Sequence, residues 1–272
     1  MLTVSELFIY PIKSLGGISV ASATVTEKGF EYDRGWMLVD ENNIFMTQRE
    51  LPAMALLQVM LADNGLNVQH KHNHASITIP YQPQTNAMMM VQVWEDFCMA
   101  QLVSKEADEW FSEMLSISCR LVYMPADTKR TVDINYAFNN ETTSFSDGFP
   151  FLLIGQSSLD ELNSRMREPL PINRFRPNIV FTGGHAFEED ELAHFTINDI
   201  NFYAVKPCAR CPITATNQQT AERGKEPLLA LSKFRRREYN VYFGQNLLHK
   251  GDGKIRVGDA IEVLERKEAM RF

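Results

Sequence analysis

Short runs of β-branched and aromatic residues recur through the first half of the chain, and such runs are typical of strands in a partly buried sheet. The first of them ends at Pro11. The segments with this pattern are 4–10, 18–25, 36–39, 76–79, 89–93 and 120–123. We therefore expect the first half of the chain to consist mainly of strands.

Three segments have the apolar spacing of a helix instead. One begins near Ser104, and the five apolar residues that form its face are Ala107, Trp110, Phe111, Met114 and Leu115. A second helix is predicted to begin at Ser158, because Glu161 completes a Ser-x-x-Glu capping box in which each side chain satisfies a free backbone N–H. Pro227 suits the first turn of a third helix, where proline is tolerated.

Strand patterns also dominate the second half of the chain. They lie at 149–154, 178–182, 200–205, 254–257 and 260–264, and the last two are predicted to form a terminal hairpin around Gly258 and Asp259. Strands and helices do not alternate regularly, as they would in a parallel α/β sheet. The pattern favours a mainly β fold with a few helices. The polar segment 125–146 is a suitable domain junction and predicts two β-rich domains, 1–124 and 125–272.

Composition narrows the classes of function. The 272 residues carry a net charge of −7, which argues against a general nucleic-acid binder because phosphate backbones require an excess of Lys and Arg. The four cysteines are too few for a disulfide scaffold. Neither a signal-peptide pattern nor an apolar run long enough for a bilayer is visible. We expect a cytoplasmic protein with reduced thiols and no membrane association.

The most informative segment is 206–212, Lys-Pro-Cys-Ala-Arg-Cys-Pro, which follows a predicted strand. Nearby cations favour the thiolate form of a cysteine, and a thiolate is a nucleophile and a soft metal ligand. The alternative is that Cys208 and Cys211 are two buried structural thiols. A structural zinc site would need a second ligand pair, which is missing, and a thioredoxin-like motif would open a helix.

Other candidates are weak when taken singly. Lys13 and Ser14 could hold an anion, although, when the segment is taken alone, a solvated lysine at a turn is the better explanation. Arginines stand at several predicted strand edges and suit phosphate or pterin-like groups if they converge; they are Arg34, Arg49, Arg174 and Arg176. His70, His72 and His74 alternate and could chelate a metal from one strand face, although an exposed hairpin is the simpler interpretation. Asp147 could lie near a pocket or serve as a turn carboxylate.

These segments together resemble the MOSC-domain proteins with an N-terminal MOSC-associated β-barrel domain, a family that includes amidoxime-reducing components and YcbX-type reductases. The resemblance extends from Leu7 to about Leu264. The matching segments, in chain order, are Tyr-Pro-Ile-Lys-Ser at 10–14, Tyr-Asp-Arg at 32–34, Thr-Gln-Arg at 47–49, Phe-Ser-Asp-Gly-Phe-Pro at 145–150, Arg-Phe-Arg-Pro-Asn-Ile at 174–179, Lys-Pro-Cys-Ala-Arg-Cys at 206–211, Lys-Glu-Pro-Leu at 225–228 and Phe-Gly-Gln-Asn at 243–246.

The resemblance implies a β-barrel-like MOSC domain and a molybdenum cofactor in the cleft between two domains. It implies that Cys211 ligates molybdenum and is the catalytic residue. The other implied cofactor-binding residues are Lys13, Ser14, Arg34, Arg176, Asn178, Ala209 and Arg210. The implied activity is reduction of small N-hydroxylated compounds such as N-oxygenated bases and amidoximes. A sulfur carrier or cofactor-binding protein that acts through a Cys211 persulfide is the alternative.

Two positions depart from the family pattern. Gln156 and Asn217 stand where relatives often carry an acidic residue, and neither amide can act as an acid or base at ordinary pH. The identity of a proton donor is therefore open. The chain also lacks iron–sulfur and dinucleotide-binding signatures, so electrons are expected from a separate protein of the ferredoxin, flavodoxin or reductase type.

Overall fold

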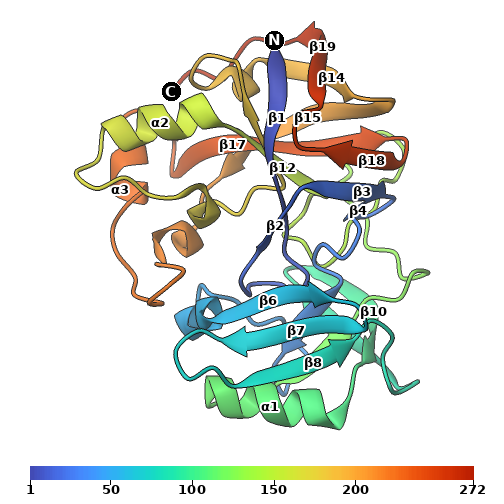
Figure 1. The fold of residues 1–272 in the computed structure, drawn as a ribbon. Coiled ribbons are helices and arrows are strands. Elements are labelled where there is room, and N and C mark those ends of the chain that lie inside the picture. Colours follow the sequence, from blue (N-terminus) through green and yellow to red (C-terminus); the bar gives the residue numbers. More distant parts are fainter.

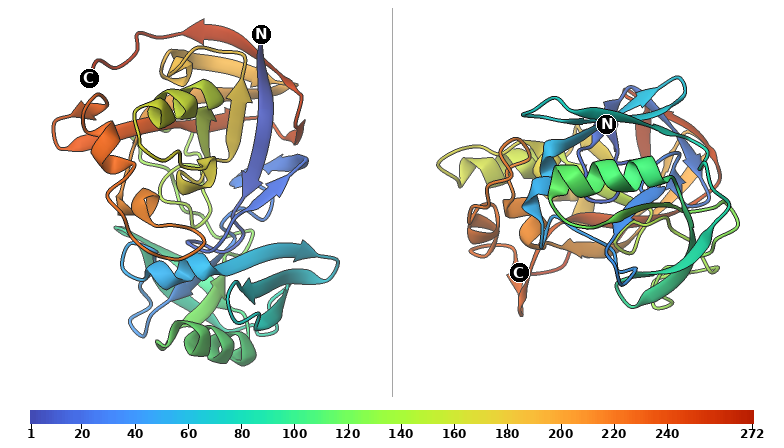
Figure 2. Two further views of the ribbon diagram at one scale, coloured as in Figure 1. Left: turned by 60° about the vertical axis from the view of Figure 1, so that its left-hand side comes forward. Right: turned by 90° about the horizontal axis from the view of Figure 1, so that it is seen from below.

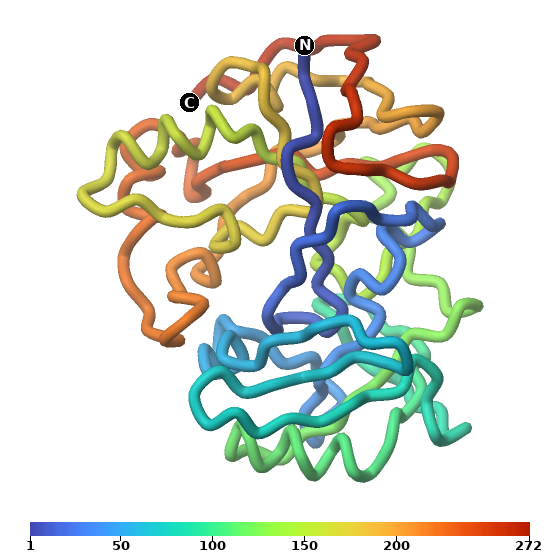
Figure 3. Tube along the Cα trace, in the orientation of Figure 1, coloured from blue at the N-terminus to red at the C-terminus, as the bar shows by residue number.

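A computed structural model describes residues 1–272, which form two bodies connected by extended segments (Figure 1). Both termini lie on the larger body, which is uppermost in Figure 1. The chain descends through its first strands into the smaller body, and it returns upward before residue 150, as the tube in Figure 3 shows. The mainly β fold with a few helices is confirmed.

The larger body is built around a closed β-barrel. Its seven strands, in ring order, are β12 (Phe151–Gly155), β13 (Ile179–Thr182), β1 (Leu2–Ile9), β19 (Ala260–Arg266), β14 (Leu192–Ile197), β15 (Ile200–Ala209) and β17 (Asn240–Lys250). The ring closes because β12 pairs with β13 on one side and with β17 on the other. A closed barrel leaves no free strand edge, so every strand is paired on both sides.

Alternate residues of the barrel strands point inward and fill its interior. Phe202 lies at the centre of an aromatic group, with ring centroids 5.4 Å from Phe151 and 5.5 Å from Phe195. All three side chains are almost completely buried. Aromatic rings bury large areas and pack best in such tilted or offset arrangements, so this group is a principal source of barrel stability.

Smaller elements decorate the barrel. They are β2 (Ile18–Val20), β3 (Ser22–Thr26), β4 (Gly29–Phe30), β16 (Arg236–Arg237) and β18 (Gly253–Arg256), the helices α2 (Gln156–Ser164) and α3 (Leu228–Leu231), and the 3-10 helices η2 (Ile172–Arg174), η3 (Glu188–Asp190) and η4 (Pro212–Ala215).

The predicted terminal hairpin is wrong. β18 pairs with β3, whereas β19 pairs with β1 and β14, so consecutive strands diverge to different partners.

The smaller body contains two sheets and one long helix, seen from below in Figure 2. One sheet has the order β5 (Trp36–Val39), β11 (Arg120–Tyr123), β10 (Asp96–Leu102), β9 (Met88–Val93), and the other has the order β6 (Leu57–Ala62), β7 (Gly65–His70), β8 (Ser76–Pro80). The remaining elements are η1 (Pro52–Leu56) and α1 (Lys105–Leu115). The helix predicted near Ser104 forms, and Ser104 caps it: its Oγ accepts a hydrogen bond from the Ala107 N–H at 3.1 Å. None of the helices is both long and apolar enough to cross a membrane.

The capping box predicted at Ser158 is wrong. Helix α2 begins two residues earlier, with Gly155 as its N-cap residue and no side-chain cap. The Ser158 Oγ instead donates to Glu189 Oε2 and accepts from the Phe187 N–H, each at 2.7 Å. Because Glu189 is fully buried, its carboxyl group needs a hydrogen-bond donor more than the helix end does.

The sheet pairing crosses the predicted division at residue 124. β1 is a member of the barrel ring, and β3 pairs with β18 near the C-terminus. The first 30 residues therefore pack with strands from the end of the chain. The assignment of domains to 1–124 and 125–272 stays a prediction.

Candidate functional site

The two cysteines of the 206–212 segment lie on different elements. β15 continues to Ala209 and therefore includes Cys208, whereas Cys211 is the N-cap residue of η4. The first half of the segment is therefore strand and not loop. Strand pairing with β17 persists because the register slips between Ala204 and Lys206 and again between Pro207 and Ala209. Proline lacks an N–H, and such irregularities let it stay in a sheet.

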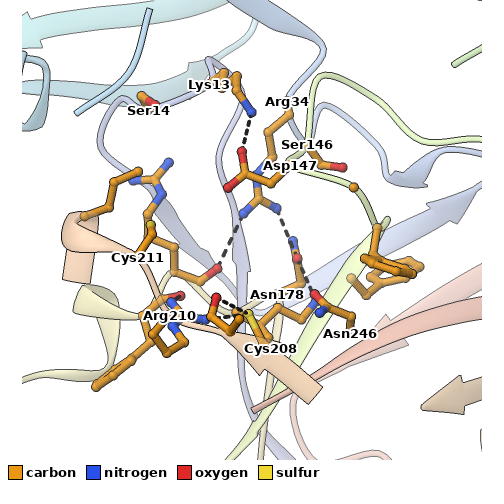
Figure 4. A pocket seen from close by; sticks show the side chains of 18 of the residues that line it. Lys13, Ser14, Arg34, Ser146, Asp147, Asn178, Cys208, Arg210, Cys211 and Asn246 are labelled. Atoms are coloured by element: carbon orange, nitrogen blue, oxygen red, sulfur yellow. Dashed lines mark hydrogen bonds and ion pairs between the residues drawn. The ribbon is translucent and has the colours of Figure 1, made fainter. Parts of the chain in front are cut away.

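A pocket between the two bodies brings the candidate residues together (Figure 4). Nineteen residues line it, including all eight that the family resemblance assigns to the cofactor: Lys13, Ser14, Arg34, Arg176, Asn178, Ala209, Arg210 and Cys211. The candidate Arg174 does not line it, and its Nε donates to the Thr214 carbonyl instead. They come from the segments after β1, β4, η2 and β15, which are far apart in sequence. Further lining residues include Arg49, Asp147, Phe149 and Asn246.

The pocket carries a strong excess of positive charge. Its cations are Lys13, Arg34, Arg49, Arg176 and Arg210, and its one carboxylate is Asp147. Asp147 forms ion pairs at 2.7 Å with both Lys13 Nζ and Arg49 Nη2. An unbalanced cationic cleft with low-dielectric walls concentrates anions, so the charge pattern favours an anionic ligand.

Burial shapes the protonation of these groups. It lowers the pKa of Lys13 to about 8, although Asp147 acts in the opposite direction. Burial also lowers the pKa of Arg176 to about 10, and Tyr10 only partly offsets that effect. Burial would raise the pKa of Asp147, but Lys13 and Arg49 hold it well below its ordinary value. The cations therefore lack solvation that a bound anion would replace.

The arginines of the pocket floor are held in place before any ligand binds. The guanidinium groups of Arg34 and Arg176 lie 4.4 and 4.2 Å from the centroid of the buried Tyr10 ring. Arg34 also pairs with Asp33 and donates to Asn178 Oδ1 at 3.0 Å. Cation–π contact and hydrogen bonding together fix the direction in which each guanidinium points.

Three of the predicted residues have an unusual backbone conformation. Ser14, Arg34 and Arg176 have φ angles of 66°, 52° and 56°, in the left-handed region that side chains disfavour. Such strain costs roughly 1–3 kcal/mol per residue and clusters at functional sites. Ten other non-glycine residues that do not line the pocket also have positive φ angles, so strain at these three positions is not peculiar to the site.

Each cysteine lies near a different arginine, and Arg210 does not bond the cysteine that follows it in sequence. Arg210 is adjacent to Cys211 in sequence, yet its Nη1 donates to Cys208 Sγ at 3.0 Å. The cation beside Cys211 is Arg49: burial would lower the pKa of Arg49, but Asp147 and Cys211 raise it. Cys208 is partly exposed, which also corrects the expectation of a buried thiol.

Two buried guanidinium nitrogens have no hydrogen-bond partner, namely Arg49 Nη1 and Arg210 Nε. Unpaired buried donors on a cation are costly, so the pocket fits a ligand rich in acceptor oxygens. Nowhere do three His, Cys, Asp or Glu side chains gather as a metal site. A metal near Cys211 would need ligands from a bound cofactor, and a pterin dithiolate with a phosphate tail fits both observations.

The interpretation of the three histidines as a metal site is wrong. His70 is the last residue of β7, and the other two lie in the turn before β8, where His72 Nε2 bonds the Gln219 carbonyl at 3.0 Å. They lie on a hairpin exposed to solvent, which agrees with the simpler interpretation.

The two departures from the family pattern do not line the pocket. Gln156 Nε2 donates to Asp160 on the surface of α2, and Asn217 Oδ1 accepts from the Gln219 N–H. The expectation that they remove carboxylates beside the site is therefore wrong. Asp147 is the carboxylate that the pocket does contain, and sequence alone could not separate it from a turn residue.

Comparison with known proteins gives matches along most of the chain. Residues 1–118 match the family model "MOSC N-terminal beta barrel domain", and residues 140–262 match "MOSC domain". Mitochondrial amidoxime-reducing component 1 of Mus musculus is 31% identical, over 96% of this chain and 82% of that protein. Molybdenum cofactor sulfurase of Danio rerio is 32% identical over 91% of this chain, but the chain spans only 32% of that protein. The crystal structure of YiiM from Geobacillus stearothermophilus overlaps slightly, with a TM-score of 0.32, 15% identity and coverage of 43% and 55%.

Proposed function

The chain belongs to the family that joins a MOSC N-terminal beta barrel domain to a MOSC domain, and from that membership we propose that it is a molybdenum-cofactor-dependent reductase of small N-hydroxylated compounds. Relatives of the family are named for amidoxime reduction and for molybdenum cofactor sulfuration. The observation that carries the proposal is the convergence of eight predicted residues, with two unpaired buried arginine N–H groups, on one cationic pocket.

The residues of the pocket divide the binding task. Cys211 would supply the soft thiolate ligand for molybdenum, with the cations of the pocket around it. Lys13, Ser14 and Arg34 would hold the pterin or its phosphate. Arg176 and Asn178 would also contact the cofactor, and Ala209 and Arg210 would lie beside it. The bound cofactor supplies two-electron redox chemistry, and the protein supplies binding, orientation and electrostatics.

The overall reaction is balanced by two electrons and two protons: an N-hydroxylated compound R–NH–OH gives R–NH2 and water, with cleavage of the N–O bond. The chain has no iron–sulfur or nucleotide motif of its own. The electrons therefore come from a separate donor protein, and a cytoplasmic location remains a prediction.

A second candidate is a sulfur carrier that forms a persulfide on Cys211. The similarity to molybdenum cofactor sulfurase favours it, as does the partial exposure of Cys211 beside a cation. A carrier would hold sulfur that a reductant releases as sulfide, and it would have no need of bound molybdenum.

Elemental analysis of the protein from a host competent in molybdenum-cofactor synthesis distinguishes the two. We expect close to one molybdenum per chain and turnover of benzamidoxime with reduced methyl viologen. Absence of molybdenum, when a control molybdoenzyme from the same cells is loaded, would refute the reductase. Cyanide-labile sulfur on Cys211 in that molybdenum-free protein would favour the carrier.

A further inference from the structure

One sheet face of the smaller body presents large apolar side chains to solvent. β9 and β10 are antiparallel, and Met90 lies opposite Met99. Side chains alternate across a strand, so the burial of Val91 and Cys98 leaves their neighbours on the outside. Together with two residues at its border, this β9–β10 face comprises Ile44, Met88, Met90, Trp94, Phe97 and Met99, which are 39% to 66% exposed.

Such a face is uncommon on a protein with no partner. Monomeric soluble proteins rarely expose contiguous apolar patches unless the patch binds something. Methionine side chains are flexible and polarisable, and surfaces rich in them adapt to a partner without a fixed complementary shape. The β9–β10 face is therefore suited to a transient protein contact.

The face is continuous with the cationic pocket. The Trp94 ring packs against Phe45, with centroids 4.9 Å apart, and the Arg49 guanidinium lies 4.5 Å from the Trp94 ring. Arg49 in turn pairs with Asp147, and both line the pocket that contains Cys211. One side chain thus separates the edge of the β9–β10 face from the pocket.

We propose that the β9–β10 face is the docking surface for the electron-donor protein, a small one-electron carrier. This inference rests on the proposed function, because only a reductase without its own electron carrier needs such a donor. A carrier seated there would approach the pocket through Trp94 and Arg49. Contacts of this kind are small and exchange quickly, as electron-transfer encounters generally do.

Charge at the border indicates the character of the partner. The two turns that lead onto the face each present an exposed glutamate, Glu41 and Glu95. Opposite charge at an interface rim speeds encounter and fixes orientation. The donor is therefore expected to surround its own apolar contact with Lys or Arg.

The test compares two electron sources for the same molybdenum-loaded protein. One is reduced methyl viologen, which needs no docking surface. The other is NADPH with an extract of source cells from which this chain has been deleted, which supplies the natural donor. The variant is Met90→Gln with Phe97→Gln. The matched control is Met60→Gln with Leu61→Gln, two residues of β6 that are 42% and 41% exposed in the wild type.

We expect the Met90/Phe97 variant to lose about tenfold in the NADPH-driven rate, as loss of a contact residue at an interface commonly does. Its viologen-driven rate should equal that of the wild type, and the control variant should keep both rates. Equal NADPH-driven rates for the two variants would overturn the docking surface, as would a wild type that uses viologen but gains nothing from the extract. A wild type that is dimeric in size-exclusion chromatography, with a monomeric Met90/Phe97 variant, would assign the face to a second copy instead. A loaded wild type that is inactive with viologen would show that the proposed function itself has failed.

Discussion

At the scale of single residues, the two cysteines of the 206–212 segment have different surroundings, which their spacing in the sequence does not predict. Cys211 is the N-cap residue of η4 and lines the pocket together with Arg49. Cys208 lies on β15 and accepts a hydrogen bond from Arg210. A thiolate ligand needs access to the metal and a cation to stabilise its charge. Both thiols line the pocket and both are partly exposed, so access and charge do not separate them; the assignment of the ligand to Cys211 rests on the family resemblance.

Substitution of each cysteine by serine tests this assignment. Cys211→Ser replaces a soft thiolate with a hard hydroxyl, so we expect loss of bound molybdenum and of reductase activity with the fold intact. Cys208→Ser keeps an acceptor for Arg210 at a partly exposed position, so it should cost less than about 1 kcal/mol and keep most activity. Molybdenum content and viologen-driven rate measure both effects, after circular dichroism confirms folding. An active Cys211→Ser with normal molybdenum content would exclude the thiolate ligand.

A buried acid away from the pocket predicts a pH dependence of stability. Burial raises the pKa of Glu189 from 4.5 to about 7, and its Oε1 has no hydrogen-bond partner. The folded state therefore favours the protonated acid, whereas the unfolded chain ionises near pH 4.5. Stability is lost as pH rises between these two values, by an amount on the order of 2–3 kcal/mol, and stays constant above the folded-state pKa.

Glu189→Gln should remove this dependence, since the amide stays neutral and can still accept from Ser158. We expect the variant to match the wild type near pH 4.5 and to exceed its melting temperature above pH 7. Calorimetric melting across that range measures the difference. A constant difference between the two proteins at all pH values would mean that the pKa of Glu189 is the same in the folded and the unfolded protein.

The residue scale also shows what sequence can and cannot provide. Lys13, Arg34 and Arg176 could be selected because their motifs resemble a family, but periodicity alone could not bring them together. The convergence of Arg34 and Arg176 depends on left-handed backbone angles and on cation–π contacts with Tyr10, and Lys13 is held by its ion pair with Asp147. Such contacts join segments more than a hundred residues apart, and no local pattern encodes them.

At the scale of elements, sequence patterns predicted a helix or a strand pair correctly only where no residue distant in sequence competes for the same groups. The helix near Ser104 forms where its apolar spacing predicted it, and Ser104 caps its first turn. The cap at Ser158 does not form because a buried carboxyl group competes. The predicted hairpin of β18 and β19 was wrong for the same reason: although the two strands are adjacent in sequence, each pairs with a strand that is distant in sequence.

Gly244 of β17 illustrates a constraint within one element. Its φ is +82°, and a Cβ there would lie 2.9 Å from the Leu153 carbonyl oxygen on the paired strand β12. We expect Gly244→Ala to destabilise the protein by about 2–4 kcal/mol, from backbone strain together with overpacking. Chemical denaturation measures the loss.

Gly258→Ala is the matched control for that measurement. Gly258 has a similar φ of +97°, but a methyl group added there would meet nothing within 4 Å, so only the backbone strain of about 1–2 kcal/mol applies. Equal losses at the two glycines would mean that the barrel relaxes around the added methyl group and that the contact with β12 is not tight.

At the scale of the whole molecule, the two bodies are held together by more than the covalent chain. Gln48 and Gln218 exchange side-chain hydrogen bonds, with Gln218 Nε2 donating to Gln48 Oε1 at 2.9 Å. Lys71 donates to the Gln218 carbonyl, and Arg223 donates to the carbonyls of Gln48 and Arg49. The loop that follows the cysteines thus rests on the smaller body, as the left view of Figure 2 shows. These contacts hold Arg49 at the pocket.

Division of the chain at residue 124 should yield no folded barrel. A fragment of residues 125–272 lacks β1, which lies between β13 and β19 in the ring, and both neighbours would expose unpaired edges. We expect this fragment to aggregate or to remain unfolded, whereas the full chain folds. A dispersed amide spectrum from the isolated fragment would contradict that expectation.

The place of β1 in the ring also determines the order in which the protein can be made. β1 leaves the ribosome before both of its ring neighbours, since Leu7 pairs with Ile179 of β13 and Leu2 pairs with Ile261 of β19. The nascent strand must therefore remain unpaired until those strands have been synthesised. Pairings this distant in sequence fold slowly and leave apolar strands open to aggregation. Loading of a cofactor into this pocket must then wait until the residues from Lys13 to Asn246 that line it have been synthesised.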